Sequence, residues 1–75
     1  MDGSAIRQRV LEVLLQRIEE ERFPSATMMN RVEGQLQTNE EVLAYAEVLL
    51  KKIEASRFPS IPMLNRLDAV LAGVD

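Results

Sequence analysis

Few side chains in this 75-residue sequence could carry chemistry. The chain has no Cys and no His. It therefore lacks the usual ligands of zinc, haem and iron–sulfur centres, as well as the Cys–His and Ser–His pairs of nucleophilic catalysis. The acids and bases that remain are carboxylates, Lys51, Lys52 and Tyr45. We therefore predict a non-enzymatic protein with no cofactor and no small-molecule substrate.

Three consecutive acids, Glu19-Glu20-Glu21, form the cluster best suited to a divalent cation. Hard cations prefer carboxylate oxygens as ligands. However, the run falls at the end of a predicted helix, where the helix dipole makes acids unfavourable and solvent screens them. A solvated helix end accounts for these residues, and we predict no metal site.

Two Asn-Arg pairs, Asn30-Arg31 and Asn65-Arg66, have side chains that can read DNA. Asn can bond to adenine and Arg to guanine, and each pair falls on the second helix of a predicted helix–turn–helix. Phosphate contacts require clustered Lys and Arg. The chain has 9 basic and 12 acidic residues and a net charge of −3. A DNA-binding regulator is therefore the alternative hypothesis, and the charge disfavours nucleic acid as the partner.

An internal repeat is the strongest pattern in the sequence. Residues 10–36 and 45–71, which are offset by 35 positions, are identical at 14 of 27 positions. The shared runs include Glu-Val-Leu-Leu and Arg-Phe-Pro-Ser. Identity in a single register predicts a duplication. We place repeat unit one at about residues 4–37 and repeat unit two at about 38–74, within one all-helical domain over residues 1–75.

Each unit has the pattern of a helix, a short turn and a second helix. Apolar residues recur every three or four positions, and a Phe-Pro pair interrupts them once in each unit. Residues suited to helix N-caps precede each apolar segment. We predict helices at about 5–21, 26–37, 39–55 and 61–72, capped by Ser4, Ser25, Thr38 and Ser60 respectively. No segment alternates like a strand.

The predicted fold is all-α, with four helices forming two tandem helix–turn–helix hairpins. Because the hairpins share their sequence, we expect them to pack with pseudo-twofold symmetry. Phe23 and Phe58 each precede a proline at the corner of a unit. We interpret them as packing plugs between the two helices of their hairpin.

The apolar arcs of the long helices are wider than the stripe of an ordinary surface helix. Either these helices touch neighbours on two sides of a four-helix core, or part of the arc forms a homodimer interface. The last helix is also more apolar than its copy, and Asn30 and Asn65 face away from the apolar stripes. The candidate interaction surface comprises Val13, Val48, Ile61, Val70, Val74, Asn30, Arg31, Asn65 and Arg66.

These features favour a small helical module for protein–protein interaction or self-association, with a regulatory or adaptor role. The expected partner is another protein or a second copy of the chain. The N-terminus lacks the charged and apolar regions of a signal peptide, and no apolar run is long enough to cross a membrane. We therefore expect a cytoplasmic protein with no membrane partner.

Overall fold

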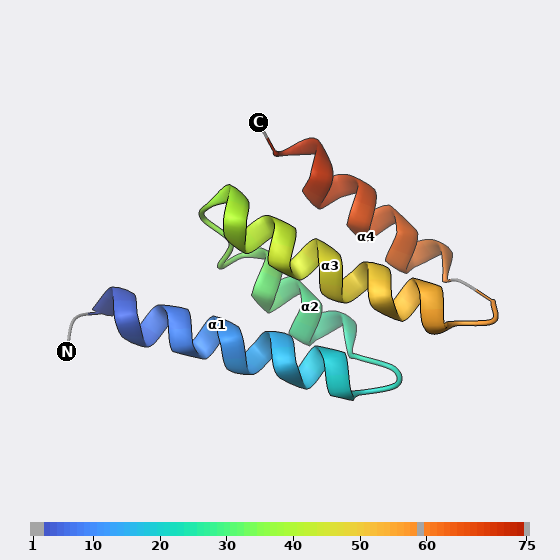
Figure 1. Cartoon of the computed structure of the whole chain (residues 1–75), viewed down its shortest axis with the longest axis horizontal. Helices are drawn as coiled ribbons and strands as arrows, with labels where there is room; N and C mark the ends of the chain where they lie inside the picture. The colour runs from blue at the N-terminus through green and yellow to red at the C-terminus, as the bar shows by residue number, and fades with distance from the viewer. Residues whose placement is uncertain (1–2, 59, 75) are drawn as a thin grey trace. The chain divides into compact units, whose positions relative to one another are not determined.

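The computed structural model describes residues 3–58 and 60–74, which form four α-helices and no strand (Figure 1). The helices are α1 (Gly3–Glu20), α2 (Ala26–Glu33), α3 (Asn39–Ala55) and α4 (Ile61–Ala72). The all-α prediction is confirmed. Helix α1 packs against α2, and α3 packs against α4. The chain divides into two compact units, Met1–Gln35 and Leu36–Asp75, which we call unit 1 and unit 2.

The second helix of each unit begins at the serine predicted to cap it. The Ser25 hydroxyl accepts a hydrogen bond from the Met28 N–H at 3.1 Å, and the Ser60 hydroxyl accepts one from the Met63 N–H at 3.4 Å. Both serines have extended backbone, as N-cap residues do. The serine of the Arg-Phe-Pro-Ser sequence is therefore the N-cap of the second helix in both units.

Helix α3 begins with the predicted capping box. The Thr38 hydroxyl accepts from the Glu41 N–H at 3.1 Å. In return, the Glu41 carboxylate accepts from the Thr38 N–H at 3.3 Å and from the Gln37 N–H at 2.9 Å. Three N–H groups at the start of the helix thus have partners, which defines where α3 starts.

Two predicted helix ends are wrong. Helix α1 begins at Gly3, so Ser4 lies inside the helix and is not its cap. Helix α2 ends at Glu33 because Gly34, a poor helix former, is its C-cap, with its N–H bonded to the Asn30 carbonyl at 3.0 Å. Helix α4 ends at Ala72 as predicted, and its C-cap Gly73 has φ of −88°.

The two units bury their apolar side chains differently. In unit 1 both helices contribute, with Leu11 and Ile18 from α1 and Met29 and Val32 from α2. The open end of this hairpin is joined by the Arg7 guanidinium, whose Nη1 donates to the Gln35 carbonyl at 3.2 Å.

Among the described residues of unit 2, the buried side chains all come from α3. They are Tyr45, Ala46, Val48 and Leu49. Helix α4 contributes none, although all twelve of its residues are described and half of them are Ile, Leu, Val or Met. Helix α4 therefore leaves part of its apolar surface in contact with water.

Candidate functional site

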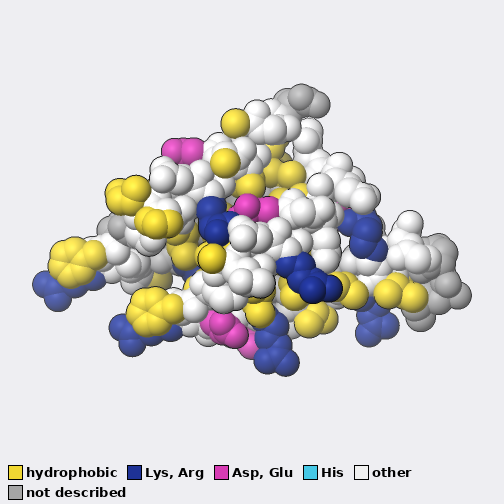
Figure 2. All heavy atoms as spheres, turned by 180° about the vertical axis from the view of Figure 1, so that it is seen from behind, with side chains coloured by type: hydrophobic (Ala, Val, Ile, Leu, Met, Phe, Trp, Pro, Cys, Tyr) yellow, Lys and Arg dark blue, Asp and Glu magenta, His cyan; other side chains and the backbone are white. Residues whose placement is uncertain are grey.

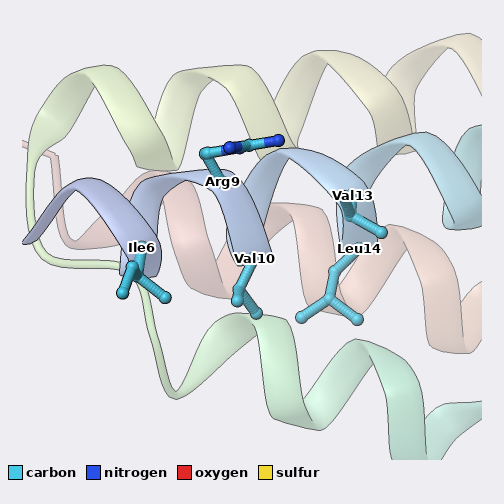
Figure 3. Close-up of a pocket in the computed structure, with 5 residues that line it drawn as sticks. All are labelled: Ile6, Arg9, Val10, Val13 and Leu14. Carbon is cyan, nitrogen blue, oxygen red and sulfur yellow. The ribbon is translucent and has the colours of Figure 1, made fainter. Parts of the chain in front are cut away.

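A row of apolar side chains lies open on α1. Ile6, Val10 and Val13 are 50%, 42% and 55% exposed, and together with Arg9 and Leu14 they line an open groove with a volume of about 320 Å³. The spacing of four and three residues places Ile6, Val10 and Val13 on one side of the helix. In Figure 3, Ile6, Val10 and Leu14 extend on the side of α2, whereas Arg9 extends on the opposite side. We call this feature the α1 groove.

Val13 and Val48 occupy matching positions in the repeat but have opposite environments. Val13 lies in the α1 groove, whereas Val48 is only 8% exposed. Val48 therefore does not contribute to an exposed interaction surface, contrary to our expectation. Val48 belongs to the buried face of α3 together with Tyr45, which lies about 60° from it around the helix. The buried face of α1 is instead centred on Leu11 and Ile18.

Helix α4 carries a second open apolar row. Ile61 and Leu71 are 65% and 41% exposed, Leu64 is half-buried, and the exposed Asp68 lies between Leu64 and Leu71. The spacing of three, four and three residues places these four side chains on one face. We call this row the α4 stripe. Ile61 is thus an exposed apolar residue as expected, whereas the expected surface residues Val70 and Val74 are half-buried.

One charged side chain of each sign is associated with these two apolar rows. Arg9 lines the α1 groove and Asp68 lies within the α4 stripe, and both are exposed. Neither has a hydrogen-bond or ion-pair partner within residues 3–58 and 60–74. Matching positions in the other unit hold Ala44 and Glu33, so Arg9 has no charged counterpart. Each row therefore offers a charge that is available to a partner.

The two Asn-Arg pairs differ in exposure. Asn30, Arg31 and Asn65 are exposed, whereas Arg66 is half-buried. Asn30 and Arg66 each already interact within the chain. Each second helix carries a single basic residue, Arg31 or Arg66. Such isolated positive charges do not form the basic face that phosphate binding requires.

Phe23 and Phe58 do not plug their hairpins, and that prediction is wrong. The two side chains are 83% and 82% exposed. The first helix of each unit ends before the Phe, and in unit 1 Figure 1 shows the turn after α1 extending beyond the end of that helix. The Arg22 guanidinium lies 5.6 Å from the centre of the Phe23 ring, and that of Arg57 lies 5.8 Å from the Phe58 ring. An Arg precedes the Phe in both copies, and this Arg-Phe pair could have indicated an exposed ring in contact with a guanidinium.

No family model, curated protein or solved structure matches this chain. Within the described ranges, three or more acidic residues do not gather where they could hold a metal ion. No helix in the same ranges has the length and apolar character to cross a membrane. Figure 2 shows hydrophobic side chains on the surface, several of them beside Lys and Arg side chains. The surfaces that can contact a ligand include the α1 groove, the α4 stripe and the exposed rings of Phe23 and Phe58.

Proposed function

We propose that this chain is a small non-enzymatic module that acts through protein–protein contacts, with the α1 groove as its docking face. The observation that carries the proposal is the row of Ile6, Val10 and Val13, each about half exposed on successive turns of one helix. Covering the exposed half of three such side chains would contribute about 2–4 kcal/mol. An amphipathic helix that lays its apolar face along the groove fits this geometry.

The proposal has a structural part and a cellular part. The 14 identities in 27 positions support a duplicated hairpin, and a pseudo-twofold arrangement of the two hairpins stays a prediction. The partner is a protein, a second copy of the chain included, and the role is that of a regulator or adaptor in the cytoplasm. No metal or organic cofactor takes part, because the chain has no Cys or His to hold the usual ones.

Site-specific crosslinking tests the docking face. A photoreactive amino acid is placed at Val13, in the groove, and in a control protein at Glu12, which is exposed on the same helix but outside the groove. We expect a discrete crosslinked product from position 13 in cells that make the protein, and none from position 12. The crosslinked protein, once identified and purified, should bind the unmodified chain.

The affinity of the purified partner then tests whether the α1 groove is the docking face. We expect Val13→Asp to raise the dissociation constant for that partner at least tenfold. Glu12→Gln, the matched control, should leave it unchanged. Equal crosslinking at the two positions, or a partner whose affinity does not change in Val13→Asp, would refute the α1 groove as the docking face.

A further inference from the structure

Matching positions of the repeat show that one face of its first helix can be either covered or open. Val10 and Val13 of α1 are 42% and 55% exposed, whereas their counterparts Tyr45 and Val48 of α3 are buried. The hairpin therefore accepts complete cover at these positions. The apolar character of Val10 and Val13 is unfavourable in water but suited to a surface that is covered.

The second helices also differ in burial, but here it is the helix of unit 2 that is more exposed. Met29 and Val32 of α2 are buried, whereas their counterparts Leu64 and Leu67 of α4 are only half-buried. Unit 1 thus has an open apolar row on its first helix, and unit 2 has one on its second helix, although α3 also exposes Leu43 and Leu50, at 49% and 45%. The α1 groove and the α4 stripe are thus two different apolar faces carried by one chain.

Building on the proposed function, we propose that the partner of the α1 groove is the α4 stripe of a second copy of this chain. Repeat proteins gain stability when one unit covers the adjoining face of the next, and these 75 residues hold two units. A contact between copies would cover both the α1 groove and the α4 stripe. The repeat already buries apolar side chains at matching positions of its other unit.

Charge selects this pairing over the symmetric ones. A groove-to-groove contact would bring two Arg9 side chains together, and a stripe-to-stripe contact would bring two Asp68 side chains together. Only a groove-to-stripe contact pairs Arg9 with Asp68, and neither of these residues has a hydrogen-bond or ion-pair partner within the described ranges. Opposite charges at the edge of an apolar contact determine which partner and which register are favoured.

The spacing of the two rows also allows helix-to-helix packing. The groove residues follow one another at intervals of four and three, and the stripe residues at intervals of three, four and three. Rows with this spacing form the ridges that fit between one another when two helices pack. The interface is heterologous, because each copy contributes a groove on one side and a stripe on the other. Such copies associate head to tail, into a ring or an open chain.

Two complementary variants test this arrangement. Val13→Asp disables the groove and leaves the stripe intact, whereas Leu71→Arg disables the stripe and leaves the groove intact. Both residues are substantially exposed, so both variants should fold, which circular dichroism checks. Mass is measured by sedimentation velocity over a range of micromolar concentrations, with Glu12→Lys as an off-groove control.

We expect the wild type and the Glu12→Lys control to associate with increasing concentration, and each disabled variant alone to remain at the 8.5 kDa of one chain. The mixture of the two variants should form a complex containing one chain of each, because one intact groove meets one intact stripe. Arg9→Glu should weaken association at least tenfold, and Arg9→Glu combined with Asp68→Arg should restore it.

Several results would overturn the inference. These are a monomeric wild type at the highest concentration, a disabled variant that still associates alone, and a mixture that forms no complex. If the wild type is monomeric but a different protein crosslinks at Val13 and its binding is weakened by Val13→Asp, the second-copy partner is wrong and the docking face stands. If no partner depends on Val13, both proposals are wrong.

Discussion

Replacing Phe23 with Ala should destabilise this protein by only about 1 kcal/mol. Because 83% of the side chain is exposed, only 17% of it is removed from water by folding. Full burial of a Phe side chain contributes about 1.5–3 kcal/mol, so this small fraction accounts for less than about 0.5 kcal/mol. The contact of the ring with the Arg22 guanidinium at 5.6 Å adds about 0.5–1 kcal/mol at an exposed site.

A buried control shows what a packing residue would cost. Ile18 is fully buried in unit 1, and truncating such a side chain to Ala costs about 2–5 kcal/mol because it leaves a cavity. A Phe that plugged the hairpin would cost about 3–5 kcal/mol on truncation. The two interpretations of Phe23 therefore differ by at least about 2 kcal/mol, which is readily measured.

Urea denaturation followed by circular dichroism at equal protein concentrations gives the free energy of unfolding of the wild type, Phe23→Ala and Ile18→Ala. For a chain of this size, 1 kcal/mol corresponds to a shift in Tm of about 4–8 °C, which provides a second measurement. Phe58→Ala should behave like Phe23→Ala, since its ring is 82% exposed. If Phe23→Ala lowers the free energy of unfolding as much as Ile18→Ala does, the Phe23 ring is packed and our interpretation of it as an exposed side chain is wrong.

Three other expectations concern single sites, and a fourth concerns DNA binding. Gly34→Ala should raise the free energy of unfolding by about 0.4–1 kcal/mol, because φ is −70° and the added Cβ meets its nearest backbone oxygen at 3.6 Å; a loss would show that the turn requires glycine. Gln35→Val should stabilise the fold by about 1 kcal/mol or more by removing a buried Oε1 that has no hydrogen-bond partner within the described residues, and a decrease in Tm would contradict this. Thr38→Ala should cost about 1 kcal/mol in urea denaturation through loss of the capping box, and no change would mean that the box adds nothing. Duplex DNA should not be retarded by the protein in a low-salt gel, whereas salt-sensitive retardation would favour the Asn-Arg hypothesis.

The sequence allowed the local structure to be predicted well. The caps at Ser25, Thr38 and Ser60 were predicted, as were the bounds of α3 and α4. These features depend on hydrogen bonds between residues three or four positions apart, so a short segment contains the information that they require. The end of α2 was placed too late because the apolar pattern continues past Gly34, where the helix itself stops.

The candidate site could be predicted only in part. Val13 and Ile61 are exposed apolar residues as expected, but Val48 is buried and the two Phe side chains are open. The rows that now define the α1 groove and the α4 stripe also include Arg9 and Asp68, which the apolar pattern alone gave no reason to select. Sequence periodicity identifies apolar positions on a helix, but it does not identify which of them another element covers.

What the sequence by itself determined is the all-α class, three of the four predicted caps and the absence of the residues that most catalysis and metal binding require. Only the tertiary structure decided which apolar residues remain open to a partner. The same Glu-Val-Leu-Leu run occurs in both units, yet Val13 is open and Val48 is buried. The physical reason is that helix formation depends on neighbours along the chain, whereas burial depends on the atoms that pack against each helix in space.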